Sequence, residues 1–277
     1  MMGRFDGKVA IITGSSSGIG RATAVLFAKE GAKITIAGKD LAAVETGAEC
    51  IKAGAKESEI LVTSGDLMEE KVRKELIDKT LEKFGKLDIL VSNHGGAFVE
   101  CKEDGSWNID TFDRTFNQNT KSTLDLCLKA EPHLKKTKGD IVLVSSICAD
   151  LSVTWNPFYA MAKISLYHLT RILGFRLAKD GIRVNCVKPG VIVTPFYSEL
   201  GFTPESIEKM SQFHGNRTIP MGRTGTCEDI AEPIAFLADR KVSGYMTGQS
   251  ITVDGGAILQ HAMSTYSFND IMKRTDL

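Results

Sequence analysis

The sequence lacks features that mark several common classes of protein. Its 277 residues carry 34 basic and 34 acidic side chains, so the formal net charge is zero. A chain without a basic surplus has no electrostatic footprint for nucleic acid. No apolar run reaches transmembrane length, and the first residues, MMGRFDGKVAIITG, lead into a short strand without a longer apolar stretch. We therefore expect no nucleic-acid or membrane partner and a cytoplasmic location.

Metal and disulfide patterns are also missing. The six cysteines are widely spread and form no Cys-x-x-Cys pair, and the five histidines show no ligand spacing. We expect buried or surface thiols in a reducing compartment and no metal site. With 43% apolar and 25% charged residues, the composition is ordinary for a globular protein. The chain is long enough to bury a core without cross-links.

Short apolar segments alternate with longer segments of helical spacing. Alternation of this kind requires parallel strands, right-handed crossovers and helices on both faces of the sheet. No linker or composition break divides the chain, so we predict a single domain over residues 1–277. It is an α/β fold, a doubly wound, Rossmann-type parallel sheet of about seven strands. The strands are expected at 8–13, 33–38, 59–66, 87–93, 140–146, 182–190 and 248–256, and the two longest helices at 111–135 and 158–179.

The first predicted strand runs into the glycine-rich stretch TGSSSGIG, which contains Gly14, Gly18 and Gly20. Binding a pyrophosphate requires a tight turn, close approach of the backbone and a helix N-terminus with free N–H groups. The spacing Gly-x3-Gly-x-Gly differs from the general Gly-x-Gly-x-x-Gly fingerprint. By itself the stretch fits either a dinucleotide site or a glycine-rich turn without a ligand.

The stretch YAMAK places Tyr159 and Lys163 four residues apart. On a helix such residues lie on one face, one turn apart. A cation beside a phenol favours the phenolate, so Lys163 would lower the tyrosine pKa from its reference value of about 10. The spacing alone fits a catalytic acid/base pair or an unremarkable pair on a helix surface.

In this order the motifs resemble the short-chain dehydrogenase/reductase family over essentially the whole chain. Thr-Gly-x3-Gly-Ile-Gly after the first strand is that family's cofactor motif, and SNHG at 92–95 stands where the family has Asn-Asn-Ala-Gly. Ser146 precedes Tyr159 by 13 residues, as in family members. Asn119, KPGVIVT at 188–194 and ITVDGG near the C-terminus also fall in the expected order.

The resemblance implies hydride transfer between a nicotinamide cofactor and a carbon that bears oxygen. Tyr159 would donate the proton in reduction and accept it in oxidation. Lys163 would also bond the nicotinamide ribose, and Ser146 would hold and polarise the carbonyl. Asn119 would support a water chain that reaches Lys163 from solvent. These four are the implied catalytic residues.

The resemblance also implies a set of cofactor contacts. NADP(H) is favoured over NAD(H), because Gly38 replaces the acid of NAD-preferring relatives and Lys39 would attract a 2′-phosphate. Ser17, where many NADP-preferring relatives have a basic residue, weakens this interpretation. Asp66 would contact adenine, or else cap the next helix. The full set is Gly14, Ser16, Ser17, Gly18, Ile19, Gly20, Lys39, Asp66, Leu67, Asn93, Tyr159, Lys163, Pro189, Gly190, Ile192 and Thr194.

Two residues depart from the family pattern beside the cofactor. Ser92 replaces an asparagine, and His94 replaces a small alanine. A functional His94 would touch cofactor or substrate and titrate near pH 6.5. We expect its ring to point to solvent instead.

The substrate region is predicted mainly from its apolar side chains. Residues 195–220 would form a short helical lid that includes Phe196, Tyr197, Leu200, Phe202, Met210 and Phe213. A second wall would consist of Trp155, Pro157 and Phe158. This composition favours an apolar or aromatic carbonyl or alcohol as substrate.

Assembly and function follow from the same resemblance. The two longest helices, and the tail at 259–277, would contact neighbouring subunits in a homodimer or homotetramer. The predicted function is an NADP(H)-dependent oxidoreductase that interconverts a ketone or aldehyde and an alcohol. The alternatives are a 3-oxoacyl thioester reductase and a non-catalytic NADP(H)-binding regulator, and the intact Ser146, Tyr159 and Lys163 argue against the regulator.

Overall fold

The computed structural model describes residues 3–38 and 40–260, which form one parallel sheet of seven strands in the order β3-β2-β1-β4-β5-β6-β7. The predicted fold class is confirmed. After β3 the chain crosses back to the other side of β1, so the strand order reverses between β1 and β4, where such folds bind ligands. The strands are β1 (Val9–Thr13), β2 (Lys33–Gly38), β3 (Ile60–Ser64), β4 (Ile89–Ser92), β5 (Asp140–Val144), β6 (Arg183–Pro189) and β7 (Ser250–Val253).

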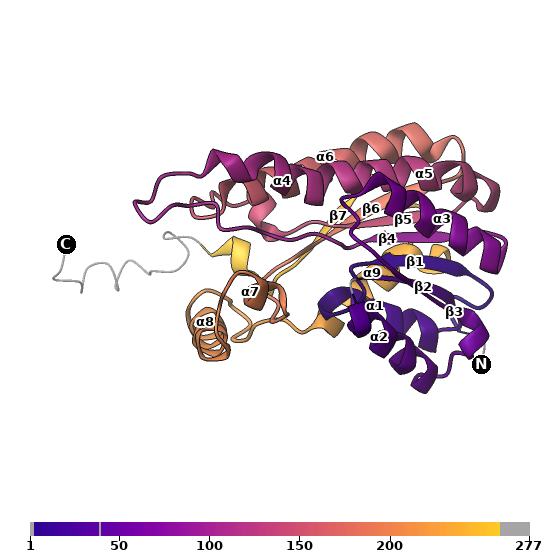
Figure 1. Ribbon diagram of the computed structural model, residues 1–277, viewed down its shortest axis with the longest axis horizontal. Helices are drawn as coiled ribbons and strands as arrows, with labels where there is room; N and C mark the ends of the chain where they lie inside the picture. Colours follow the sequence, from indigo (N-terminus) through magenta and orange to yellow (C-terminus); the bar gives the residue numbers. More distant parts are fainter. Residues whose placement is uncertain (1–2, 39, 261–277) are drawn as a thin grey trace.

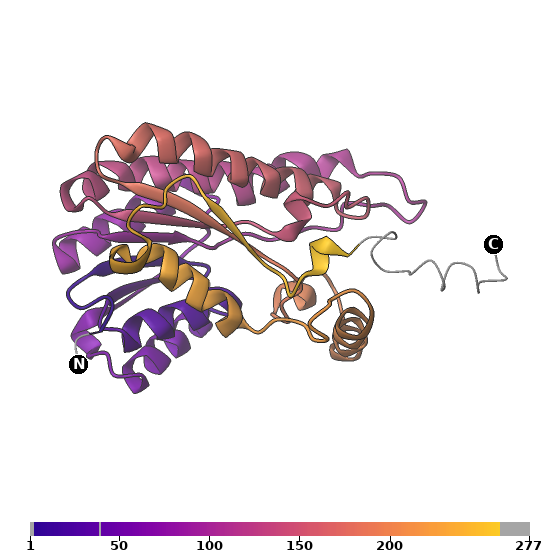
Figure 2. The same ribbon diagram turned by 180° about the vertical axis from the view of Figure 1, so that it is seen from behind.

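Helices cover both faces of the sheet (Figure 1). One layer contains α1, α2 and α9, and Figure 2 shows α9 beside α1. The other layer contains α3 to α6. The bounds of these helices are α1 (Gly18–Lys29), α2 (Asp40–Lys52), α3 (Glu70–Phe84), α4 (Phe112–Phe116), α5 (Ser122–Thr137), α6 (Pro157–Ala178) and α9 (Cys227–Ala238).

The core is divided between the two faces of the sheet. Ala10 and Ile12 of β1 belong to the cluster under α1 and α9, whereas Ile11 belongs to the cluster under α3, α5 and α6. Alternate side chains of a strand point to opposite faces, so consecutive apolar residues fill both clusters. This explains why the strands appear in the sequence as continuous apolar runs.

The helix predicted at 111–135 is interrupted in the structure. A π-helical segment, Asn117–Lys121, separates α4 from α5. Two side chains there bond the carbonyl four residues earlier: Asn119 Nδ2 donates to Thr115 O at 2.9 Å and Ser122 Oγ to Gln118 O at 2.7 Å. The interruption coincides with Asn119, whose amide is also held by the backbone of Gly96, and apolar spacing alone does not reveal such a contact.

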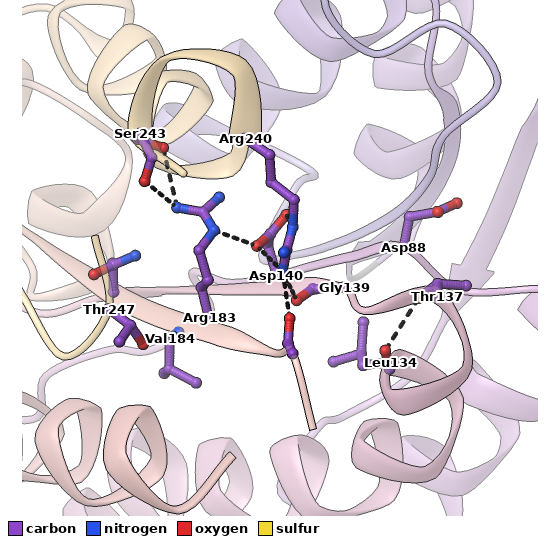
Figure 3. A network of polar contacts seen from close by, with 12 residues as sticks. Asp88, Leu134, Thr137, Gly139, Asp140, Arg183, Val184, Arg240, Ser243 and Thr247 are labelled. Carbon is purple, nitrogen blue, oxygen red and sulfur yellow. Dashed lines mark hydrogen bonds and ion pairs between the residues drawn. The ribbon is translucent and has the colours of Figure 1, made fainter. Parts of the chain in front are cut away.

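A buried charge network ties the sheet together at the amino ends of its strands (Figure 3). Asp140, the first residue of β5, forms an ion pair with Arg183, with 2.9 Å between Oδ1 and Nε, and accepts a hydrogen bond from Arg240 Nε to Oδ2 at 3.0 Å. Arg183 begins β6 and also donates to Ser243 O at 2.7 Å. Arg240 and Ser243 are the ends of α10 (Arg240–Ser243). The network therefore joins β5, β6 and α10 far from the glycine-rich turn.

At the carboxyl ends of the strands, the chain adds two helices beyond the sheet, α7 (Phe196–Glu199) and α8 (Pro204–Arg217). Within residues 3–38 and 40–260, no helix is long and apolar enough to cross a membrane. The same residues contain no cluster of three or more His, Cys, Asp or Glu side chains suited to a metal ion. The tail predicted at 259–277 lies outside the described residues from 261 onward.

Candidate active site

A cavity of about 680 Å³ opens at the carboxyl ends of β1, β4, β5 and β6. It extends from the glycine-rich turn to α7 and α8. Its position at the reversal of strand order matches the general site of ligand binding in such sheets. The predicted site residues that line it are Gly14, Ser16, Ser17, Gly18, Ile19, Asp66, Leu67, Asn93, Ser146, Tyr159, Lys163, Pro189, Gly190, Ile192 and Thr194.

The glycine-rich turn has the shape that a pyrophosphate requires. Gly14 and Gly18 have φ values of 63° and 56°, which a side chain rarely allows. Gly20 does not line the cavity; a Cβ there would lie 2.2 Å from Gly14 O, so this glycine permits close packing of α1 on β1. Helix α1 begins at Gly18 without an acidic residue in its first turn. Its free N–H groups and positive dipole end therefore suit an anion.

In the described part of the chain, β2 ends at Gly38, which brings no carboxylate to this end of the cavity. A Cβ at Gly38 would lie 2.7 Å from the Ser16 side chain, so a larger residue would crowd the turn. Lys39, the predicted phosphate contact, lies outside the described residues. Asp66 lines the cavity and accepts from Met68 N at 2.9 Å, which pins its own turn rather than capping α3.

His94 is buried, so the expectation of a solvent-pointing ring is wrong. Only 8% of the residue is exposed. Its Nδ1 lies 2.8 Å from Thr13 Oγ1 and its Nε2 lies 2.9 Å from Ser122 Oγ. Because the Ser122 hydroxyl donates to Gln118 O, it accepts from His94 Nε2, which carries the proton, while Nδ1 faces the Thr13 hydroxyl. Burial lowers the pKa of His94 to about 3, so a neutral ring cross-links β1, the end of β4 and α5.

Asn119 is fully buried behind the cavity. Its side chain accepts from Gly96 N at 3.2 Å and donates to Gly96 O at 2.8 Å. A Cβ at Gly95 would lie 2.6 Å from Asn119 Oδ1 and 3.0 Å from Lys163 Nζ. Asn119 Oδ1 and Lys163 Nζ therefore both lie against Gly95, and there is no space for a side chain at that position.

Ser146, Tyr159 and Lys163 converge on one wall of the cavity. Ser146 follows β5, and its Oγ accepts from Cys148 N at 3.1 Å. Tyr159 and Lys163 lie one turn apart on α6, with Lys163 Nζ 5.5 Å from the centre of the tyrosine ring. Lys163 Nζ also donates to Val144 O at 3.1 Å, which fixes the end of its side chain.

Burial dominates the titration of this group. It raises the pKa of Tyr159, and a hydrogen bond with Ser146 opposes the rise only in part. It also lowers the pKa of Lys163 to about 8. The shift of the tyrosine pKa is opposite to the one predicted from the Tyr-Lys spacing, because desolvation of the phenol is the largest influence on it.

An aromatic row extends from Tyr159 into the segment 195–220. The ring of Phe196 lies 5.7 Å from Tyr159 and 5.4 Å from Tyr197, which in turn lies 6.0 Å from Phe202. Leu200 and Met210 also line the cavity, as predicted for this segment, and so does Trp155.

Three of the apolar residues predicted at the substrate end do not line the cavity. Phe158 is buried against Trp107 and Phe112, and Pro157 is buried beside it at the start of α6. Phe213 is 58% exposed and lies outside the lining. Neighbouring residues of a helix point in different directions, and the apolar composition of a segment does not show which of them face the cavity.

Sequence reasoning missed several residues at the site. Gln118 and His214 line the cavity, and Glu100 contacts the backbone of Tyr159 from a distant loop. Gln118 could have been suspected from the sequence, because it directly precedes Asn119. Glu100 and His214 had no such signal, because their positions depend on contacts between separate elements.

Known proteins resemble this chain over nearly its full length. A family model described as enoyl-(acyl carrier protein) reductase matches residues 14–257. Dehydrogenase/reductase SDR family member 4 of Caenorhabditis elegans is 35% identical over 259 residues, which cover 91% of this chain and 96% of that protein. The 3-oxoacyl-(acyl-carrier-protein) reductase FabG of Thermotoga maritima is 34% identical over 264 residues, which cover 92% and 100% of the two chains.

Solved structures agree with these relatives. A short-chain dehydrogenase/reductase of Caenorhabditis elegans, solved with cofactor, aligns with a TM-score of 0.90 at 39% identity. The alignment covers 95% of this chain and 100% of that one. Family members bind a nicotinamide cofactor, and the glycine-rich turn described above fits one. The chain belongs to the short-chain dehydrogenase/reductase family of oxidoreductases.

Proposed function

We propose that this chain is an NADP(H)-dependent oxidoreductase that interconverts a ketone or aldehyde and an alcohol. The observation that carries the proposal is the convergence of Ser146, Tyr159 and Lys163 on one wall of a cavity that also contains the glycine-rich turn. Bound cofactor supplies the hydride. The side chains of the protein then have to hold the reacting oxygen and move one proton.

Each of the three side chains has a distinct proposed role. Tyr159 donates its proton to the carbonyl oxygen; because burial raises its pKa, the phenol stays protonated at neutral pH. Ser146 bonds the same oxygen as negative charge develops on it. Lys163 holds the cofactor ribose and passes protons to the tyrosine, with Asn119 as support. A protonated phenol suits reduction, which an NADPH-rich cytosol also favours.

The preference for NADP(H) is supported by the end of β2. A carboxylate there would bond the 2′-hydroxyl of NAD(H) and repel the 2′-phosphate of NADP(H), and Gly38 has no side chain. Lys39 follows directly in the sequence and is the proposed phosphate partner.

Two larger features complete the proposal. The segment 195–220 acts as the substrate lid, since its aromatic row reaches Tyr159. The outer faces of α5 and α6 expose Leu128, Ile172 and Phe175, the last to 89%. We propose that these faces pack against a second copy in a homodimer or homotetramer.

A side-by-side titration with NADPH and NADH, followed by cofactor fluorescence, tests the cofactor assignment. NADPH should bind at least about tenfold more tightly. Lys39→Ala should weaken NADPH binding by about tenfold and leave NADH binding unchanged, because it removes one charge from the phosphate. Lys33→Ala, at the opposite end of β2, is the control. Equal affinities for both cofactors would contradict the assignment, and a carbonyl screen at saturating cofactor then tests the reaction.

The 3-oxoacyl thioester reductase is the second candidate, because the Thermotoga maritima relative bears that name. A thioester such as acetoacetyl-coenzyme A, included in the same screen, separates the two. Faster turnover of the thioester than of simple aryl ketones would favour this alternative.

A further inference from the structure

Glu100 is a carboxylate buried beside the active site without touching the cavity. It lies in the loop after β4, and only 1% of it is exposed. Its Oε2 accepts from the backbone N–H of Phe158 at 2.7 Å and of Tyr159 at 3.2 Å. Its Oε1 accepts from Thr115 Oγ1 at 3.0 Å. The Asn156 amide, with its nitrogen toward Glu100, adds contacts at 3.1 and 2.7 Å.

Helix α6 needs such a partner because its own sequence provides none. Asn156, the N-cap residue, makes no side-chain capping bond, and the first turn contains no acidic residue. Pro157 has no N–H, so Phe158 and Tyr159 supply the first free donors, in a buried setting. Helix α9 is different: there the local residues Thr226 and Asp229 form a capping box.

The charge of Glu100 suits this place. A negative group at a helix N-terminus is favoured by the dipole of the helix, and more so when both are buried. Burial raises the pKa of Glu100, while the bonds from Tyr159, Phe158 and Thr115 oppose the rise. Four donor groups around one carboxylate satisfy the ionised form.

The contacts of Glu100 extend through Thr115 to Asn119, another of the implied catalytic residues. Thr115 donates its hydroxyl to Glu100, and its backbone oxygen accepts from Asn119 Nδ2 at 2.9 Å. One residue of α4 therefore joins the cap of α6 to Asn119. A shift of Glu100 would displace both the tyrosine and the amide behind Lys163.

We propose that Glu100 is a positioning residue for the acid/base tyrosine: its carboxylate caps α6 through the N–H of Tyr159 itself and so fixes where the phenol enters the cavity. This inference rests on the proposed function of Tyr159. Small displacements of a reacting group have large effects on rate, about 100-fold for 1 Å. Glu100 thus acts on turnover through the backbone, without contacting substrate or cofactor.

Two variants of Glu100 separate the cap from the charge. Glu100→Ala removes both and should lower kcat by about 10- to 100-fold, with the best ketone of the screen above. It should leave the Kd for NADPH within about threefold, because the glycine-rich turn is not in contact with Glu100. Glu100→Gln keeps an acceptor and should restore most of the lost rate. Amide hydrogen exchange of residues 157–163, measured by mass spectrometry, should become faster in Glu100→Ala and intermediate in Glu100→Gln.

The matched control is Asp88→Asn. Asp88 is also buried, at 4% exposure, and accepts from Val9 N at 2.9 Å, but it lies at the amino end of the sheet. The Asp88→Asn variant should have a lower free energy of unfolding, with kcat and amide exchange at 157–163 unchanged. An unchanged kcat in Glu100→Ala, or an equal loss in Asp88→Asn, would overturn the proposal.

The exchange measurement decides in two further cases. If Glu100→Ala does not fold, Glu100→Gln must still show faster exchange at 157–163 than the wild-type chain, and wild-type exchange would overturn the proposal. If the wild-type chain reduces no carbonyl at all, the proposed function fails. Even then, unchanged exchange in the Glu100 variants would overturn the cap separately.

Discussion

The two ends of the sheet both bury charged side chains but partner them differently. At the amino end, Asp140 lies between Arg183 and Arg240, and both guanidinium groups also donate to backbone oxygens (Figure 3). At the carboxyl end, Lys163 is buried at 3% exposure and donates to Val144 O. Within the described part of the chain, no carboxylate contributes to its pKa.

This difference separates charges that hold the fold from charges that are available for chemistry. A buried charge with matched partners is costly to disrupt, because removal of one partner leaves the others desolvated. A buried lysine without a carboxylate has its pKa lowered toward neutrality, where it exchanges protons readily. The Asp140 network at the amino end therefore serves stability, whereas Lys163 at the carboxyl end is a charge that can respond to a ligand.

The largest effect should come from Tyr159→Phe at the carboxyl end. Loss of the transferable proton should lower kcat by about 100- to 10,000-fold. The Kd for NADPH should stay the same, because the variant removes only the hydroxyl. Tyr167→Phe, two turns further along α6, is the control and should retain full activity. Steady-state kinetics and fluorescence titration check both variants, and substantial turnover by Tyr159→Phe would exclude the proposed acid/base role.

Asp140→Ala tests the amino end. It leaves the buried Arg183 and the partly buried Arg240 without their shared carboxylate, so the free energy of unfolding should fall by about 3–5 kcal/mol. The kcat of the folded fraction should not change. Asp180→Ala breaks a more exposed pair with Lys135, 3.2 Å apart, and should cost less than about 1 kcal/mol.

Urea unfolding followed by circular dichroism measures both losses. A loss in Asp140→Ala as small as that in Asp180→Ala would mean that the network contributes little. A fall in kcat for folded Asp140→Ala would mean that the charge network at the amino end also affects the active site at the carboxyl end.

The fold could be predicted from the sequence because its signals are local. Continuous apolar runs mark strands that are buried on both faces, and the predicted segment 158–179 differs from α6 by one residue at each end. The helix at 111–135 was predicted without its interruption. The π-helical segment contains Asn119, whose amide bonds the backbone of Gly96 in the loop after β4, and a contact between separate elements leaves no local pattern.

The candidate site divides in the same way. The glycines and the pair Tyr159 and Lys163 could be identified because their spacing reflects one turn or one helix. His94 and Glu100 could not be understood this way, since their partners Thr13 and Phe158 lie 81 and 58 residues away. Contacts between residues so far apart in the chain leave no recognisable pattern in the sequence. The burial of His94 and the cap on α6 are therefore seen only in the structure.

The smallest expected effect concerns the charge of Lys163, and it tests directly whether the two ends of the sheet treat buried charge differently. Its pKa is about 8 in the folded chain against an ordinary value of 10.5, so between these values the unfolded chain binds a proton that the folded chain does not. The contribution of Lys163 to the free energy of unfolding, measured as the difference between the wild-type chain and Lys163→Met, should therefore rise as pH increases from about 8 to about 10.5. Lys163→Met keeps much of the volume and removes this dependence.

At pH 7 the full penalty for burying the charge is present, so Lys163→Met should be the more stable chain, by up to about 3 kcal/mol. The difference should shrink toward zero near pH 10.5, as measured by urea unfolding at several pH values. Lys209→Met, on the exposed face of α8, should show no such trend. A difference that stays constant from pH 7 to 10 would mean that Lys163 keeps its proton as firmly as Arg183 does, and that the two ends of the sheet treat buried charge alike.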